Sequence, residues 1–346
     1  MNPAFNLLVA TIVASLLFLT FRRRGWFARW RHRARRRATR VHIEDALKHL
    51  FTFAELGQVG SLESLAGAVE VSRDDAARLA ARLEQKGLVR PYRAGWELTD
   101  EGRRYALQVI RTHRLWERYL ADETGIDEGE WHERADQIEH KMSPDEVEAL
   151  SERMGHPAYD PHGDPIPSAD GTMGTPLGVP LNTIPSGRAV RIVHVEDEPE
   201  SVYRLLRNAN LQPGMTLQVI ESTPEQVRLD AGVFRCVLPP VAAANVSVQE
   251  LDESEASALA RHRLSSLKVG QTAQVVDLSP ACRGLERRRL LDLGLVPGTT
   301  VKAELQSMGN DPTAYRIRGA LIALRRQQAD LILIKPNGGE PAKPVN

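Results

Sequence analysis

The sequence predicts a multidomain α+β protein that comprises a transmembrane helix, a winged helix-turn-helix, a further helical domain and two small β-barrels. Three observations predict this architecture. An apolar run without charge occupies residues 3–21, helical patterns followed by a β-hairpin lie between residues 41 and 123, and one helix-to-strand motif occurs twice in the C-terminal half. A chain of 346 residues is long enough for two or three domains.

The charge is unevenly distributed along the chain. Basic and acidic residues number 45 each, but residues 22–40 hold ten arginines and no acid, which leaves 35 basic residues against 45 acidic ones elsewhere. The body of the protein is therefore acidic, which excludes a generic polyanion binder. The two cysteines, Cys236 and Cys282, exclude a disulfide framework or a cysteine zinc site and fit a reducing compartment.

The N-terminal segment is expected to span a membrane. The 19 residues from Pro3 to Phe21 carry no charge, and a helix of that length is about 28 Å long, close to the ~30 Å hydrocarbon core. We assign residues 1–24 to the transmembrane helix and 25–40 to a basic juxtamembrane segment. The arginines after the apolar run place the C-terminal domains in the cytoplasm and predict a single-pass protein of the cytoplasmic membrane. A cleaved signal peptide is disfavoured, because its basic residues would precede the apolar run.

The arginine cluster has two interpretations. As a signal for topology and for binding the lipid surface it needs no other partner, and we favour this interpretation. As an arm that contacts DNA it would lie directly before a DNA-binding domain.

Residues 41–103 have the pattern of a winged helix-turn-helix. Apolar positions at helical spacing predict a helix over 41–55, and Ser61 and Ser72 are expected to cap two further helices, the second of which ends at Gly87. Two short strands follow in LVRPYRAGWELT, with an expected turn at 94–95. Thr99 opens a long helix towards Glu123. This order of elements is typical of a winged DNA-binding domain.

The rest of the chain contains a linker and a repeat. Residues 155–185 are rich in Pro and Gly and predict a linker without a core of its own. RLLRNANLQPGMTL at 204–217 and RRLLDLGLVPGTTV at 288–301 then share a Leu-Leu pair, a Leu-x-Pro-Gly turn and a Thr in phase. In each copy the Pro-Gly pair leads from a short helix into β-rich sequence, so we interpret the repeat as a duplication of a small β-domain.

Two strings predict a metal site. In RTHRLWERYL (111–120), His113 and Glu117 are four residues apart and share one face of a helix. In WHERADQIEHKMS (131–143), the ligand-type residues of one helical stripe are His132, Asp136, Glu139 and His140. Either pair alone fits a surface helix or a buried structural histidine. Together they favour a bound cation, because buried carboxylates resist desolvation without one.

With these motifs, residues 41–167 resemble the diphtheria-toxin-repressor family of metal-dependent transcriptional regulators. The resemblance rests on the wing, on HRLWERYL, on the helix that ends in EHKMS, and on GHPAYDPHGDPIP. It implies a winged helix followed by a helical dimerisation domain at 104–154, a homodimer, and Fe(II) or Mn(II) as corepressor. The ion would bridge the first helix to the dimerisation helices and fix the spacing of the two recognition helices on a palindromic double-stranded operator.

The resemblance also implies two sets of ligands. The primary site would use Asp45, Asp136, Glu139 and His140, and the ancillary site would use His113, Glu117 and His132. Asp45 and Asp136 replace the Met and Cys of iron-sensing members, and oxygen donors favour Mn(II) or Fe(II) over thiolate-loving metals. Lys48 stands where manganese-sensing members have a second carboxylate, which argues against their binuclear site.

The repeated segments resemble FeoA-like, SH3-like domains, which we place at 186–252 and 265–337. This module is shared by ferrous-iron transport accessories and by some of these repressors. In some family members the appended barrel donates an ancillary ligand, and Glu198 or Glu200 are the nearest candidates here. Cys236 and Cys282 are expected in or near the barrel cores.

The expected recognition helix, SRDDAARLAAR, departs from the family pattern. Asp74 and Asp75 stand where members place small polar residues, and acids face phosphates unfavourably. Asp accepts from cytosine N4, so base reading is still open to this helix. The arginines expected to hold the DNA backbone are Arg73, Arg78 and Arg82 on the helix and Arg90 and Arg93 on the wing.

The sequence therefore predicts a membrane-anchored, Fe(II)- or Mn(II)-dependent transcriptional regulator of metal homeostasis. The alternative is an accessory subunit of a membrane ferrous-iron transport system that does not bind DNA, and a partnership with an iron or manganese transporter is expected in that case. An enzyme is disfavoured, because the sequence contains no nucleophile motif, phosphate loop or dinucleotide fingerprint.

Overall fold

A computed structural model describes residues 11, 26–231, 234–252, 255, 263–279 and 281–336. The expected transmembrane segment therefore lies almost wholly outside the described residues. Among the residues that the structure does describe, no helix combines the length and the apolar character needed to cross a membrane. The chain divides into two compact units, 1–110 and 111–346.

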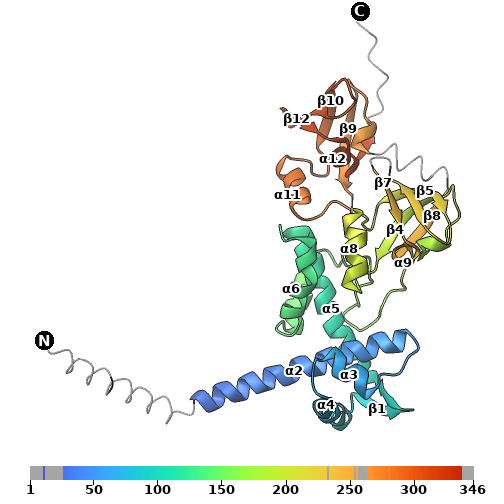
Figure 1. Cartoon of the computed structure of the whole chain (residues 1–346). Coiled ribbons are helices and arrows are strands. Elements are labelled where there is room, and N and C mark those ends of the chain that lie inside the picture. Colours follow the sequence, from blue (N-terminus) through green and yellow to red (C-terminus); the bar gives the residue numbers. More distant parts are fainter. Residues whose placement is uncertain are drawn as a thin grey trace, which may run out of the picture. The chain divides into compact units, whose positions relative to one another are not determined.

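The first unit is a helical domain with a two-stranded wing (Figure 1). Its elements are α2 (Trp26–Glu55), α3 (Leu62–Ala68), α4 (Arg73–Gln85), β1 (Val89–Tyr92), β2 (Gly95–Leu98) and the first part of α5 (Asp100–Glu123). Ser61 caps α3 and Ser72 caps α4, as expected, and Gly87 follows α4 with a φ of +70°. The basic segment expected at 25–40 is helical from Trp26 and continuous with the helix predicted at 41–55.

The turn of the wing differs by one residue from the expectation. Tyr92 pairs with Gly95, so the turn consists of Arg93 and Ala94, and Arg93 has a φ of +51°. Gly95 is the first residue of β2, and its backbone lies against Gly60. A Cβ on residue 95 would be only 2.1 Å from the Gly60 carbonyl oxygen. The Trp96 N–H donates a hydrogen bond to the same oxygen and stabilises this close approach. Gly95 is thus required for packing against Gly60, whereas the left-handed position of the turn is occupied by Arg93.

The second unit begins with helices. After the end of α5 come the short helix η1 (Glu128–Glu130), α6 (Trp131–Glu139) and α7 (Pro144–Arg153). Trp131 and Leu115 are fully buried and anchor α6 and α5 in two small apolar clusters. Ser143 and Glu146 form a capping box at the start of α7.

The segment after α7 is not the linker that its composition suggests. Most of residues 160–167 are buried, and Ile166 packs with Leu115 and Leu150. The carbonyl oxygens of Pro165 and Pro167 accept hydrogen bonds from the guanidinium groups of Arg114 and Arg111. This Pro- and Gly-rich segment is therefore a packed loop. Its buried carbonyl groups lack regular secondary-structure partners, and arginine side chains satisfy them instead.

Two small β-domains follow, and they share one order of elements. The first comprises β3 (Val179–Pro180), η2 (Leu181–Thr183), β4 (Ala189–Val195), α8 (Glu200–Asn208), β5 (Thr216–Ser222), β6 (Val227–Asp230), β7 (Arg235–Leu238), α9 (Pro240–Ala244) and β8 (Val246–Leu251). The second comprises η3 (Leu264–Ser266), β9 (Thr272–Leu278), α11 (Gly284–Asp292), β10 (Thr300–Gln306), β11 (Thr313–Ile317), β12 (Ala320–Leu324), α12 (Arg326–Asp330) and β13 (Ile332–Pro336).

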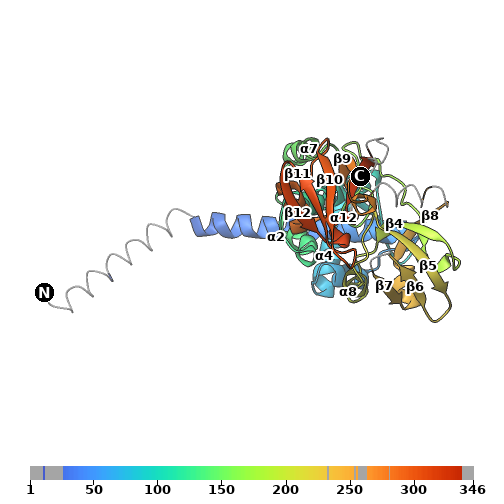
Figure 2. The ribbon, with the colours of Figure 1, turned by 90° about the horizontal axis from the view of Figure 1, so that it is seen from above.

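The sheets support the duplication inferred from the sequence. The strand order is β8-β4-β5-β6-β7 in the first domain, with β3 added at the edge, and β13-β9-β10-β11-β12 in the second. Figure 2 shows β10, β11 and β12 side by side in the second sheet. Each domain has its own apolar core; Cys282 is buried in one and Cys236 packs against the other, as expected.

The expected closed β-barrels are not seen among the described residues. The strand orders end at β3 and β7 in one sheet and at β12 and β13 in the other, so both sheets are open. Closure requires the two edge strands to pair. In the second domain the chain passes from one edge strand to the other through α12, and those strands do not pair.

Candidate metal centre

The centre is built on two helices of the second unit. His113 and Glu117 lie one turn apart on α5, and His132 and Asp136 lie one turn apart on α6. The burial of Trp131 and Ala135 fixes which face of α6 turns to the protein interior. The prediction that the members of each pair lie one turn apart on a helix is therefore confirmed for both helices.

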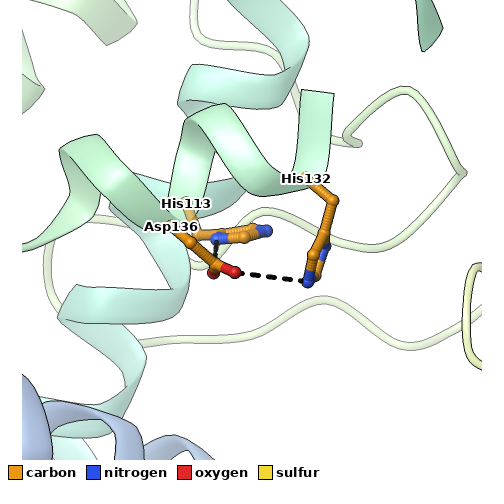
Figure 3. Close-up of side chains that lie close together, drawn as sticks. All are labelled: His113, His132 and Asp136. Carbon is orange, nitrogen blue, oxygen red and sulfur yellow. Dashed lines mark ion pairs between the residues drawn. The ribbon is translucent and has the colours of Figure 1, made fainter. Parts of the chain in front are cut away.

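His113, His132 and Asp136 converge from these helices (Figure 3). His113 Nδ1 is 3.3 Å from Asp136 Oδ1, and His132 Nε2 is 3.6 Å from Asp136 Oδ2. The two imidazole rings meet edge to face with centroids 4.8 Å apart. The sequence had assigned Asp136 to one site and the two histidines to another, whereas the structure brings the three together.

Glu139 and His140 lie at the end of α6. Glu139 is 3 % exposed, and its Oε2 accepts a 2.6 Å hydrogen bond from His113 Nδ1. His140 Nε2 is 3.4 Å from Glu139 Oε1. Because α6 ends at Glu139, His140 adopts the C-cap position instead of continuing the helical stripe.

Glu117 connects the two histidines. Its Oε1 lies 3.1 Å from His113 Nε2 and 3.3 Å from His132 Nδ1, and the residue is 1 % exposed. Burial by itself raises the pKa of this carboxyl, but His113 and His132 outweigh it and hold the pKa of Glu117 well below its usual value. Glu117 is therefore an ionised carboxylate inside the protein.

Two further residues join this centre that the sequence analysis did not assign. Asp197, which follows β4 and directly precedes Glu198, places its Oδ2 3.5 Å from His132 Nδ1. His162 comes from the packed loop after α7, and its Nδ1 lies 3.8 Å from the same Asp197 oxygen. Neither residue belongs to a periodic pattern. His162 does lie in GHPAYDPHGDPIP, one of the segments that resemble the repressor family.

The electrostatics of the centre favour a cation. The neighbouring carboxylates of Asp197 and Glu117 raise the pKa of His132 to about 10, so a proton occupies this imidazole where no metal ion does. The donor atoms are imidazole nitrogens and carboxylate oxygens, and both cysteines lie elsewhere, in the β-domains. Such a set fits Mn(II), Fe(II) or Zn(II) and offers nothing to thiolate-seeking metals.

The remaining predicted site residues belong to the first unit. Asp45 lies half-buried on α2. Arg73 pairs with Glu63 at 2.9 Å and Arg78 pairs with Asp75 at 2.6 Å, while Arg82 is exposed on α4. Arg93 stacks over Tyr92 at the tip of the wing, and Arg90 pairs with Glu97. Two of the three recognition-helix arginines are thus paired with neighbouring acids.

Comparison with known proteins decides the family. The chain is 32 % identical over 197 residues to the iron-dependent repressor IdeR of Mycobacterium leprae, a match that covers 52 % of this chain and 84 % of that repressor. The chain belongs to the iron-dependent repressor family. A second member, the diphtheria toxin repressor of Corynebacterium efficiens, is 29 % identical over 221 residues, which are 60 % of this chain and 95 % of that protein.

The domain matches agree with this assignment to the iron-dependent repressor family. Residues 99–168 match the family pattern described as iron dependent repressor, metal binding and dimerisation domain, and residues 262–336 match the FeoA domain. A solved structure of a manganese-dependent transcriptional repressor in complex with manganese is similar over 60 % of this chain and all of that one, with 29 % identity and a TM-score of 0.52. The family consists of repressors, so the prediction that the chain is not an enzyme is confirmed.

Proposed function

We propose that this protein is a transcriptional regulator of metal homeostasis that responds to Fe(II) or Mn(II). The observation that carries the proposal is the convergence of His113, His132 and Asp136 in the domain that matches the family's metal-binding region. His113 also hydrogen-bonds to the buried Glu139. A bound divalent ion supplies the positive charge that makes these carboxylates stable side by side.

The ligands that we propose comprise six residues of the second unit and one residue of the first. His113, Glu117, His132, Asp136, Glu139 and His140 provide imidazole and carboxylate donors within the second unit. Asp45 remains a proposed ligand on the strength of the sequence resemblance. An oxygen-rich set of this kind supports Mn(II) or Fe(II) as the physiological ion.

DNA binding is proposed through α4 and the wing of a homodimer. A palindromic operator is what the sequence resemblance implies, and one relative is an iron-dependent repressor. The elements proposed to read the DNA are α3, α4, β1 and β2. Asp74 and Asp75 in the first turn of α4 reduce the positive potential there. We therefore expect weak, strongly salt-dependent binding.

The test is DNA retention by the full-length protein purified in detergent. A DNA fragment from upstream of the protein's own gene is expected to be retained in about 100 µM Mn(II) and released when the ion is chelated. The reason is that a bound ion stabilises only the conformation that binds it. A fragment with the palindrome scrambled serves as control. Retention that is the same with and without Mn(II) would contradict the proposal.

We also propose, on the sequence alone, that residues 3–21 anchor the protein in the cytoplasmic membrane with its domains in the cytoplasm. The support is the uncharged run followed by the arginine cluster. Replacing Val13 and Leu17 by Arg is expected to release the protein into the soluble fraction of lysed cells. Membrane association of that variant equal to the natural protein would contradict the anchor.

The second candidate function is a regulatory subunit of a ferrous-iron transport system. The observation that favours it is the FeoA domain at 262–336, next to a second domain with the same strand order. Co-purification of a transporter with the full-length protein, together with no DNA retention at any Mn(II) concentration, would favour this candidate. Occupancy of a promoter in cells would exclude it as the sole role.

A further inference from the structure

The second β-domain buries an arginine that the proposed regulator mechanism does not use. Arg283 directly precedes α11, in the domain that matches FeoA, and is 9 % exposed. A guanidinium group stays charged in proteins. A buried charge is costly unless acidic groups lie near it. The surroundings of Arg283 therefore indicate what this side chain is placed to contact.

Two carboxylates of the helical region act on Arg283 electrostatically. Burial lowers the pKa of the guanidinium group to about 10 and Arg118 lowers it further, whereas the negative charges of Glu128 and Asp122 raise it. Asp122 lies near the end of α5, and Glu128 is the first residue of η1. The second β-domain thus places a buried cation among acidic groups of the helical region.

The backbone next to Arg283 packs on the segment that joins α5 to η1. A Cβ on Gly125 would lie 2.6 Å from Leu285 Cδ2, and a Cβ on Gly284 would lie 3.9 Å from the Ile126 carbonyl oxygen. The start of α11 therefore lies directly on residues 125–126. This contact is independent of charge and supports the placement of Arg283 beside η1.

The first β-domain contacts the same short helix. Glu128 accepts a 2.6 Å hydrogen bond from the Tyr203 hydroxyl and a 3.3 Å hydrogen bond from Gln212 Nε2. Arg207 Nη1 lies 3.5 Å from Asp127 Oδ1. Both β-domains therefore meet the helical region at η1, and Glu128 is the side chain on which they converge.

η1 leads directly into the helix that carries part of the metal centre. α6 begins at Trp131, and its second residue is His132. Trp131 is 2 % exposed, and its Nε1 donates a 3.0 Å hydrogen bond to the Ile126 carbonyl oxygen. The segment on which α11 packs is therefore also the segment that holds the start of α6.

We propose that Arg283 anchors the FeoA domain to η1 and that this docking strengthens ion binding at the metal centre. The inference rests on the proposed function, because it concerns the same divalent ion. Arg283 and Glu128 are positioning residues, since neither is a proposed ligand. A docked FeoA domain restricts the start of α6, so His132 loses less conformational freedom when it binds the ion. Such coupling is reciprocal, so the ion also stabilises the docked domain.

The first experiment measures Mn(II) affinity of the full-length protein purified in detergent. Metal-free protein is titrated with Mn(II), and free Mn(II) is measured by its electron paramagnetic resonance signal. Arg283→Met is expected to weaken the tightest Mn(II) binding at least about 5-fold, the lower end of typical coupling between sites. The matched control is Arg288→Met, because Arg288 is exposed on the same helix, and this variant should bind like the natural protein. Unchanged affinity in Arg283→Met would overturn the proposal.

The second experiment measures the docking by amide hydrogen exchange. Mn(II) is expected to slow exchange in α11 of the natural protein, although no proposed ligand lies in that helix. In Arg283→Met, exchange in α11 should be faster and insensitive to Mn(II). Equal exchange in α11 of the natural protein with and without Mn(II) would also overturn the coupling.

A variant on the other side of the contact keeps the test decisive if Arg283→Met does not fold. Glu128→Gln retains an acceptor oxygen for the Tyr203 hydroxyl but removes the charge that acts on Arg283. It is expected to weaken Mn(II) binding as well, and unchanged affinity would contradict the proposal. In the double variant the two losses should be less than additive, because both changes remove one interaction. Fully additive losses would show that Arg283 and Glu128 act independently and would overturn the anchor.

The outcomes separate this inference from the proposed function. If Arg283→Met binds Mn(II) more weakly while DNA retention by the natural protein is independent of Mn(II), the docking holds and the regulator function fails. If DNA retention depends on Mn(II) while Arg283→Met binds Mn(II) like the natural protein, the regulator function holds and the docking inference is wrong.

Discussion

The imidazole of His113 lies against the carboxylate of Glu139, with 2.6 Å between Nδ1 and Oε2, and this contact links α5 to the end of α6. His113 Nε2 faces Glu117 on its other side at 3.1 Å. One ring thus contacts carboxylates through both nitrogens, and a metal ion that uses either nitrogen must displace one of these contacts. The arrangement makes the region sensitive to the loss of any single carboxylate.

The first prediction concerns Glu139. Glu139→Gln is expected to weaken the tightest Mn(II) binding at least 100-fold, because an amide is a poor substitute for a carboxylate ligand. The fold should persist, since the amide oxygen still accepts from His113. Isothermal titration calorimetry measures the change, with Glu133→Gln as control; Glu133 is an exposed acid of the same helix. Strong binding in Glu139→Gln would show that Glu139 is no ligand.

The second prediction concerns Asp75. It holds Arg78 in a 2.6 Å ion pair, and Ser72 and Arg78 keep the pKa of its carboxyl below the usual value. Asp75→Asn is expected to free Arg78 for a phosphate, to tighten DNA binding and to steepen the dependence of log K on log salt concentration by about one. The control is Asp145→Asn in the first turn of α7. Equal salt slopes for Asp75→Asn and the natural protein would contradict DNA contact by this face of α4.

The third prediction concerns pH and Tyr105. Its hydroxyl donates to the buried Glu44 at 2.6 Å, and burial together with this carboxylate raises the pKa of Tyr105 to about 12. The unfolded chain loses the Tyr105 proton near pH 10, so the stabilisation is complete below pH 10 and is lost as the pH rises to about 12. Burial also raises the pKa values of Tyr203 and Tyr315, so ultraviolet titration should show one late-titrating tyrosine fewer in Tyr105→Phe than in the natural protein. A tyrosinate spectrum complete by pH 10.5 would contradict it.

The fourth prediction concerns Gly163 in the packed loop. Its φ is +98°, and a Cβ would lie 2.0 Å from the Val193 carbonyl oxygen. Gly163→Ala is expected to lower the free energy of unfolding by about 1–3 kcal/mol or more, through strain and overpacking. Gly155→Ala is the control, because Gly155 has a φ of +73° but open space around it, and should lose only about 1 kcal/mol. Thermal unfolding of both variants measures the difference, and equal losses would mean that the contact with β4 is unimportant.

The periodic parts of the centre could be predicted from the sequence. His113 and Glu117, and likewise His132 and Asp136, share a helical face because four residues nearly complete one turn, and this holds wherever the helix lies. The caps Ser61 and Ser72 and the repeated Pro-Gly turns were predictable for the same reason, since each acts on its immediate neighbours. The duplication was inferred from the sequence, and the matching strand orders of the two domains support it.

The aperiodic parts could not be predicted. His162 and Asp197 lie 35 residues apart in segments without regular spacing, and the first belongs to a stretch whose Pro and Gly content suggested a linker. The one-residue error in the wing turn has a similar origin, because Gly95 is required by the distant Gly60 and not by the turn itself.

By itself, the sequence determined the helices, the wing, the repeat and two pairs of ligand-type residues that each share one helical face, because helix caps, periodicity and turn residues act over a few positions. Only the tertiary structure decided which side chains meet. Burial brings Glu117, His162 and Asp197 from three segments into one space, and moves Asp136 next to His113 and His132. Such contacts depend on how whole elements pack, and no local rule encodes them.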